Sequence, residues 1–257
     1  MRRNSRSDTV HSIKMQGTLE KFSDAAQWIV PTDPAQVLAF LTTKAPAAHF
    51  VFSTSFSRED QIITHTIASQ KLPIHIFTID TGRHFPETYK TMQATRERYS
   101  THDYNFRIET YFPKTEAVEK LLSEKGPYSF YNSPDERIAC CAIRKVEPLT
   151  RALANADFWI TGIRKAHSPS RHDLPRLEVD KNNSVYKIHP LLDMTDAEMN
   201  ELIHNENIPY NKLQDRGFLS IGCEPCTRAV KLGESMRAGR WWWENTDKKE
   251  CGLHTRS

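Results

Sequence analysis

The segment HFVFSTSFSREDQIITHTIASQKLPIHIFTID, residues 49–80, contains two apolar runs separated by an amphipathic one. The first run, 49–55, predicts a buried strand that leads into a loop, and the last, 74–80, predicts a second strand. Between them, 59–70 has the apolar spacing of a helix. A strand, a helix and a strand in this order are typical of neighbouring parallel strands, so the segment predicts an α/β sheet.

The same alternation continues along the chain. Further helices are expected over 87–100, 115–126, 140–156 and 195–208, and further strands over 105–111 and 157–163. The predicted fold class is therefore α/β: a mostly parallel sheet with helices on both faces. Such a sheet binds ligands beyond the carboxyl ends of its strands.

The length and composition favour one domain. A chain of 257 residues can bury a sizeable core, and no Pro/Gly/Ser-rich linker divides it. We expect residues 1–25 to form a loosely held N-terminal extension and 26–257 to form a single domain. The net charge of +3 is too small for a nucleic-acid coat, and the sequence has no signal-peptide core and no apolar run long enough to span a membrane. The sequence therefore predicts a soluble, cytoplasmic protein with no nucleic-acid or membrane partner.

Polar residues follow both strands of the opening segment. Ser55, Phe56 and Ser57 lie between the first strand and its helix, where backbone N–H groups and hydroxyls can bind a phosphate. A Ser57–Asp60 capping box explains the same serine without a ligand, and the loop lacks the glycines and lysine of the usual phosphate loop. Asp80, Thr81 and Gly82 follow the second strand, and two polar strand ends side by side favour a nucleotide.

Four of the five cysteines form two pairs. Cys140 and Cys141 are adjacent, whereas Cys223 and Cys226 bound the turn CEPC, a spacing typical of zinc and iron–sulfur sites. Adjacent cysteines on a helix diverge by about 100°, which is awkward around one zinc ion and easier around the separated irons of a cluster. The pairs favour a 4Fe-4S cluster; zinc, redox cysteines and packing cysteines remain alternatives. Cys251 is left over in the charged tail.

Seven motifs, in the same order along the chain, resemble those of the assimilatory adenylylsulfate reductases, relatives of the phosphoadenylylsulfate reductases. They are SFSRED (55–60), IDTGRHFPETY (79–89), CCAIRKVEPL (140–149), TGIRKAHSPSR (161–171), GCEPCTRAV (222–230), RAGRWWWE (237–244) and KECGLH (249–254). The resemblance implies an adenine nucleotide hydrolase-like fold, and makes 26–257 a nucleotide-binding reductase domain with a catalytic C-terminal tail. Arg58 is a departure, because these relatives often have a small residue or glycine in that loop.

The resemblance also implies site residues. It places a 4Fe-4S cluster on Cys140, Cys141, Cys223 and Cys226, and the catalytic thiol at Cys251. Cationic side chains are needed to offset the charge of sulfate and phosphate. The substrate-binding residues that it implies are Ser55, Phe56, Ser57, Asp80, Thr81, Gly82, Lys145, Gly162, Arg164, Arg171, Arg237, Arg240 and His254.

The implied function is the thioredoxin-dependent reduction of adenylylsulfate to sulfite and AMP, in sulfate assimilation and cysteine biosynthesis. The Cys251 thiolate would attack the sulfur of adenylylsulfate, expel AMP and form S-sulfocysteine. Thioredoxin or glutaredoxin would then release sulfite. The oligomeric state stays open, a homo-oligomer included.

Three alternative functions remain. The phosphoadenylylsulfate branch typically lacks the paired cysteines, although the cationic stretch 161–171 could accept an extra phosphate. A tRNA sulfurtransferase of the same fold would carry an SGGxDS-type loop and a nucleic-acid patch, whereas this chain has SFSRED and a nearly balanced charge. In a metal-stapled interaction module without catalysis, Cys251 would have no role.

Overall fold

A six-stranded sheet forms the centre of the computed structural model, which describes residues 17–18, 20–101, 106–167 and 171–244. The strand order is β3-β2-β1-β4-β6-β5, and all neighbouring strands are parallel except β5 and β6. The strands are β1 (Phe50–Ser53), β2 (His75–Ile79), β3 (Ile108–Tyr111), β4 (Phe158–Ile160), β5 (Leu177–Asp180) and β6 (Val185–Ile188). The predicted mostly parallel sheet is confirmed.

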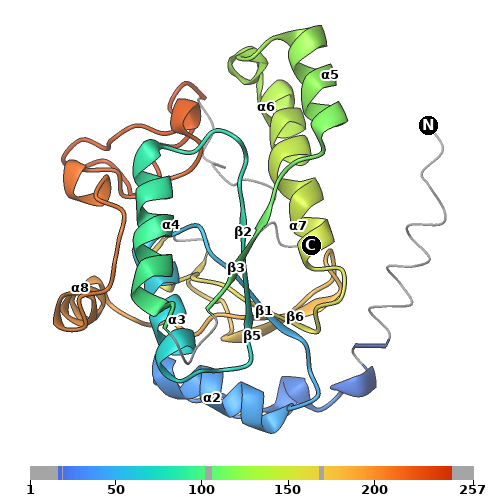
Figure 1. The fold of residues 1–257 in the computed structure, drawn as a ribbon, viewed down its shortest axis with the longest axis vertical. Helices are drawn as coiled ribbons and strands as arrows, with labels where there is room; N and C mark the ends of the chain where they lie inside the picture. The colour runs from blue at the N-terminus through green and yellow to red at the C-terminus, as the bar shows by residue number, and fades with distance from the viewer. Residues whose placement is uncertain (1–16, 19, 102–105, 168–170, 245–257) are drawn as a thin grey trace.

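Helices cover both faces of this sheet (Figure 1). Side chains alternate along each strand, so that Phe50 and Phe52 join one apolar cluster and Val51 joins another. The first cluster packs under α2 (Pro34–Lys44), α3 (Arg58–Ser69), α4 (Pro86–Tyr99) and α8 (Asp196–Asn205). The second packs under α7 (Glu147–Ala152).

The register of the parallel strands brings their carboxyl ends to one edge. Ser53 pairs with Phe77, and Phe52 pairs with Ile160, so β1, β2 and β4 end almost level. The loops that follow these three strands therefore meet at the same place. This edge contains the candidate site.

The two pairs of cysteines are carried by the later half of the chain. A series of helical segments contains the first pair: α5 (Thr115–Lys125), the 3-10 turn η2 (Ser129–Tyr131), α6 (Pro134–Cys141), the π-helical segment η3 (Ala142–Val146) and α7. The remaining 3-10 turns are η1 (Ala25–Gln27), η4 (Lys165–His167), η6 (Gln214–Arg216) and η7 (Glu224–Cys226). The second pair of cysteines lies in and beside η7.

The structure differs from the sequence-based expectation at several places. The helix expected over 140–156 begins earlier, at Pro134, because Ser133 caps it and accepts a hydrogen bond from Glu136 N–H. The β5–β6 hairpin and α2 were not predicted. Phe22 is a buried member of the first cluster, and most of the expected extension, 1–16 and 19, lies outside the described residues. Among the helices of the described ranges, none is long and apolar enough to cross a membrane.

Candidate functional site

A cavity of about 250 Å³ lies beyond the carboxyl ends of β1, β2 and β4. Its position is the one at which open parallel sheets bind their ligands. Eight of the proposed substrate-binding residues line it: Ser55, Ser57, Thr81, Lys145, Gly162, Arg171, Arg237 and Arg240. The structure thus brings together residues from five separate motifs. Below, this space is called the main cavity.

The loop between β1 and α3 forms one wall of the main cavity. Ser57 caps α3, since its side chain accepts a hydrogen bond from Asp60 N–H. The second half of the expected capping box is wrong, because the Asp60 carboxylate instead accepts 2.7 Å bonds from both N–H and Oγ of Ser55. Phe56 has a positive φ of 60°, which bends the loop around the helix end, and its side chain is buried. Asp60 therefore fixes this loop from beneath.

Asp60 is buried against the loop that follows β4. Burial raises the pKa of its carboxyl to about 6, although the hydrogen bonds from Ser55 lower it. Gly162 is needed opposite this carboxyl, because a Cβ at that position would lie 2.3 Å from Asp60 Oδ1. The loop between β1 and α3 and the TGIR motif (161–164) are therefore packed together through the Asp60 carboxyl group.

Four residues proposed for substrate binding are not among those lining the main cavity. Phe56 is one of them. Asp80 accepts hydrogen bonds from Gly82 N–H (2.8 Å) and from Tyr89 Oη (3.0 Å), so it fixes the turn after β2. Gly82 provides the positive φ of 71° that this turn requires. The fourth residue is Arg164.

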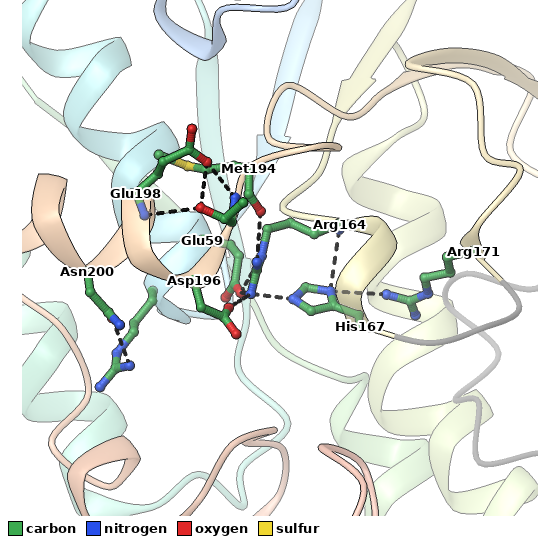
Figure 2. A network of polar contacts seen from close by, with 10 residues as sticks. Glu59, Arg164, His167, Arg171, Met194, Asp196, Glu198 and Asn200 are labelled. Atoms are coloured by element: carbon green, nitrogen blue, oxygen red, sulfur yellow. Dashed lines mark hydrogen bonds and ion pairs between the residues drawn. The ribbon is translucent and has the colours of Figure 1, made fainter.

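Arg164 is fully buried beneath the main cavity (Figure 2). Its Nε donates to Glu59 (3.0 Å), its Nη2 to Asp196 (2.5 Å), and its Nη1 to the Met194 carbonyl (2.9 Å). Glu59 also lies 2.8 Å from His167 Nε2. Burial would raise the pKa of Glu59, but the hydrogen bond from His167 and the charges of His167 and Arg164 lower it to about 2. Arg164 thus joins α3 to α8 instead of facing a ligand.

The opposite wall is cationic. Lys145, Arg237 and Arg240 line it together with Cys223. Arg240 is buried and donates only weakly, from Nη1 to Ser220 Oγ (3.3 Å) and to the Ile221 carbonyl (3.4 Å), and among the described residues its Nε has no hydrogen-bond partner. This wall can therefore provide donors and positive charge to an anion.

The four paired cysteines line one small cavity behind this wall. Lys145 and Cys223 line both cavities, so the two sites are adjacent. The cysteine cavity is lined further by Arg83, Phe130, Arg137, Arg144 and Trp241. Within the described ranges, no group of three or more His, Cys, Asp or Glu side chains is arranged to hold a metal ion.

Four cysteine thiols and several cationic side chains line the same cavity, a donor set whose chemistry suits an anionic group bound through sulfur. Arg144 is held in place by a 2.7 Å bond from Nη1 to the Thr81 carbonyl. Burial raises the pKa of the Cys223 thiol, but Lys145, the Thr81 hydroxyl 3.2 Å away, and Arg240 outweigh it and lower the pKa below its ordinary value. The cavity thus favours negative charge at Cys223, whereas burial raises the pKa of the Cys140 thiol and raises that of Cys226 to about 12.

The π-helical segment explains how Lys145 reaches both cavities. A π turn is wider than an α turn, so it changes the direction of every side chain that follows. Here it begins directly after Cys141 and contains Arg144 and Lys145. These two cations and the cysteine pair consequently share one surface of the same helical stretch.

Comparison with known proteins identifies the family. The model of the phosphoadenosine phosphosulfate reductase domain matches residues 49–229. The chain belongs to this family. Among relatives in this family, the adenosine 5′-phosphosulfate reductase of Allochromatium vinosum is 47% identical over 206 residues, which cover 80% of this chain and 78% of that protein. That of Burkholderia cepacia is 45% identical over 203 residues, 79% of each chain.

Solved structures agree with the family assignment. The phosphoadenylyl-sulfate reductase from Candida auris, in a phosphate complex, is 28% identical, with a TM-score of 0.62, covering 77% of this chain and 90% of that one. The yeast FAD synthetase, at 15% identity, has a TM-score of 0.50, covers 86% of this chain and 73% of that one, and shares the fold alone. The resemblance inferred from the seven motifs and the nucleotide-binding α/β fold class are both confirmed.

The proposed catalytic residue, Cys251, and the proposed substrate-binding residue His254 lie outside the described part of the chain, since both belong to 245–257. Within the described part, the sequence analysis missed Glu59, Arg144 and His167, which contact or line the two cavities. Glu59 had a signal, since it lies in the motif SFSRED, two residues after Ser57. Arg144 lies beside Lys145 in a proposed motif, but only the π turn shows that both residues reach the cysteines.

Proposed function

We propose that this chain reduces adenylylsulfate to sulfite and AMP, with electrons from a thioredoxin-like dithiol. The observation that carries the proposal is the main cavity, in which hydroxyls at the α3 N-terminus face a wall containing Lys145, Arg237 and Arg240. Adenylylsulfate places a phosphate and a sulfate next to each other, so it needs donors and cations on both sides. The relatives named adenosine 5′-phosphosulfate reductase support this substrate.

The reaction requires a thiolate. Cys223 lines the main cavity, but it is one of the four paired cysteines, and we assign the attacking thiolate to Cys251. Its sulfur attacks the sulfate sulfur, the S–O bond to the phosphate breaks, and AMP leaves with the bonding electrons. The product on the protein is S-sulfocysteine. One thiolate of the dithiol then attacks the Cys251 sulfur and releases sulfite, and its second thiol resolves the mixed disulfide, so two electrons reach the sulfur.

The cationic wall lowers the barrier of the first step. Negative charge accumulates when an anionic thiolate approaches a sulfate, and fixed cations offset it. Arg240 has a buried Nε without a partner, which a substrate oxygen can satisfy. Lys145 belongs to this wall and also lines the cavity of the paired cysteines. We therefore expect the sulfate end of the substrate at this wall and place His254 as a partner of the thiolate or of the substrate.

We further propose that Cys140, Cys141, Cys223 and Cys226 hold a 4Fe-4S cluster. The support is that all four line one cavity whose other polar side chains are cationic. The cluster would contribute positioning and electrostatics next to Lys145, not electrons, because the thiols account for both electrons of the reduction. The protein is expected in the cytoplasm, where thiols are kept reduced. Glutaredoxin remains a second candidate reductant, and a homo-oligomer remains open.

The phosphorylated substrate is the alternative that has support of its own. The family model and the Candida auris structure carry the name of phosphoadenylylsulfate, whereas the relatives with 43–47% identity carry the name of adenosine 5′-phosphosulfate. The test is to incubate the pure protein with each nucleotide and reduced thioredoxin, and to measure sulfite and AMP. We expect a higher kcat/KM for adenylylsulfate. A preference for the 3′-phosphorylated nucleotide would move the chain to the other branch.

A second experiment tests the role of Cys251. Mixed with adenylylsulfate and no reductant, the protein should release about one equivalent of AMP and carry one sulfo group on the Cys251 peptide. Cys251→Ser should bind the nucleotide but form no adduct, because a serine hydroxyl at neutral pH is almost wholly protonated. An adduct on Cys140, Cys141, Cys223 or Cys226, or sulfite production by the serine variant, would refute the assignment.

A third experiment tests the cluster without an activity assay. Anaerobically purified protein should contain about four irons and four acid-labile sulfides per chain and absorb in the visible range. Stoichiometric zinc without sulfide would contradict the cluster. Metal-containing protein that binds no adenylylsulfate would instead favour a non-catalytic interaction module.

A further inference from the structure

Thr161 lines the main cavity and contacts a buried histidine on its other side. Its Oγ1 lies 2.8 Å from Nδ1 of His189, a residue with no solvent exposure. The other ring nitrogen of His189, Nε2, lies 3.2 Å from Glu178 Oε1. A hydroxyl, an imidazole and a carboxylate thus form one chain of hydrogen bonds that runs from the cavity to β5.

The series of hydrogen bonds from Thr161 through His189 to Glu178 fixes the direction of each bond in it. A carboxylate only accepts, so Glu178 requires the proton of the neutral imidazole to be on Nε2. Nδ1 is then an acceptor, and the Thr161 hydroxyl must donate its single hydrogen to it. Toward the main cavity, Thr161 can therefore present only oxygen lone pairs.

The surroundings of His189 keep the ring neutral. Burial lowers its pKa, and the positive charges of Lys187 and Arg171 lower it further, against the raising effect of Glu178. Arg176 adds positive charge nearby, because its Nη1 donates to the His189 carbonyl. A neutral ring is the form that accepts a hydrogen bond from Thr161.

We propose that Thr161 Oγ1 accepts a hydrogen bond from an O–H or N–H donor of the nucleoside part of the substrate, and that His189 and Glu178 position it for this purpose. The inference rests on the proposed nucleotide substrate. Sulfate and phosphate oxygens of the ionised substrate only accept hydrogen bonds, so they cannot be the partner. The donors of adenosine are the two ribose hydroxyls and the adenine amino group.

Calorimetric binding of AMP and three analogues tests the inference: 2′-deoxyAMP, 3′-deoxyAMP and IMP, which has a carbonyl in place of the amino group. We expect at least one analogue to bind the unaltered protein about three- to tenfold more weakly than AMP, the usual value of one hydrogen bond. In Thr161→Val that penalty should fall below about twofold, and in Thr161→Ser it should persist. The analogue that is affected identifies the donor.

His189→Leu tests the positioning role. The Thr161 hydroxyl can then turn and donate into the cavity, so the same penalty should shrink while AMP still binds. The matched control is His75→Leu, since His75 also pairs with a glutamate (Glu109, 2.7 Å) but lies at the start of β2, away from the cavity. His75→Leu should leave the affinity of each of the three analogues, relative to that of AMP, unchanged.

The outcomes separate the two proposals. Failure of the unaltered protein to bind AMP would remove the proposed nucleotide site itself. Binding of AMP with the same three ratios in Thr161→Val as in the unaltered protein would overturn only the acceptor role of Thr161. Ratios that change in Thr161→Val but not in His189→Leu would overturn the positioning role of His189. The two Thr161 variants leave His189 in place, so they test the acceptor even if the leucine variant does not fold.

Discussion

Arg164 and Arg240 are both buried arginines from motifs that the sequence assigned to substrate binding, yet their surroundings are opposite. Arg164 contacts two carboxylates and a carbonyl at 2.5 to 3.0 Å. Arg240 contacts a hydroxyl and a carbonyl at 3.3 and 3.4 Å, and its Nε has no partner. In the part of the chain that the structure describes, no carboxylate pairs with Arg240.

The difference indicates that Arg164 has a structural role, whereas Arg240 is available to bind an anionic ligand. An unpaired guanidinium is costly to bury, so a site that contains one is incomplete without an anion. Arg164 already has its anions, from Glu59 and Asp196. Membership of a motif does not distinguish these two cases, whereas the partners of each side chain do.

Glu59→Gln should have the largest effect of the variants that test this comparison, and the effect should be on stability. It removes one of the two carboxylates of the buried Arg164, and breaking a buried ion pair costs about 3 to 5 kcal/mol. Because the folded pKa of Glu59 is about 2 against an ordinary 4.5, its contribution is complete above pH 4.5 and is lost as the pH falls toward 2. Urea unfolding at pH 7 measures the loss of stability in the variant, and the same experiment at pH 3 measures how much of the Glu59 contribution is lost in acid.

The control for this variant is Glu124→Gln. Glu124 pairs with Lys120 on the exposed surface of α5, so the change should cost less than about 0.5 kcal/mol. Equal losses in the two variants would mean that the Arg164 pair is no more than a surface contact.

Arg240→Leu should instead affect turnover. It removes a donor and a positive charge from the wall where charge accumulates, so kcat/KM should fall about 100- to 1000-fold. The free energy of unfolding should change little, because the same variant also removes an unpaired buried charge. Steady-state sulfite production measures kcat/KM, and urea unfolding measures the free energy of unfolding. Turnover within tenfold of the unaltered protein, or a stability loss as large as that of Glu59→Gln, would place Arg240 in the same class as Arg164.

Asp60→Asn tests the neighbouring carboxyl, whose pKa is shifted in the opposite direction to that of Glu59. Its folded pKa is about 6 against an ordinary 3.8, so the folded state binds the proton more tightly and stability is lost as the pH rises from about 4 to 6. The loss amounts to about 2 to 3 kcal/mol above pH 6. We expect the stability of the asparagine variant to fall less over this range, as measured by urea unfolding from pH 4 to pH 7. Parallel curves would mean that Asp60 has an ordinary pKa.

The sequence was sufficient for the features that depend on local pattern. Ser57 lies between a strand and a helix, and it caps the helix as expected. The two pairs of cysteines also line one cavity, as the motif order implied. In both cases the residues lie close together in sequence or belong to motifs that the resemblance places at one site.

The features that the sequence did not provide depend on distant partners. Nothing near Arg164 shows that Asp196, 32 residues later, will neutralise it. The π turn after Cys141 leaves no recognisable pattern, because its residues also suit an α-helix. His189 likewise has an ordinary sequence setting, and only the packing of β6 beside β4 brings it to Thr161.

Arg58→Ala should have the smallest effect, although Arg58 departs from the family pattern within the loop that we propose to bind the substrate. Its guanidinium donates to Asn200 (3.2 Å) and Asp215 (3.3 Å) and lies over the ring of Tyr210, and it is absent from the lining of the main cavity. Partly exposed pairs of this kind are worth at most about 1 kcal/mol. We therefore expect kcat/KM for adenylylsulfate to stay within about twofold and stability to fall by less than about 1 kcal/mol. A tenfold loss of kcat/KM at unchanged stability would mean that Arg58 reaches the nucleotide. Arg58 would then differ from both Arg164 and Arg240, because it would pair with Asp215 in the folded protein and also contact the substrate.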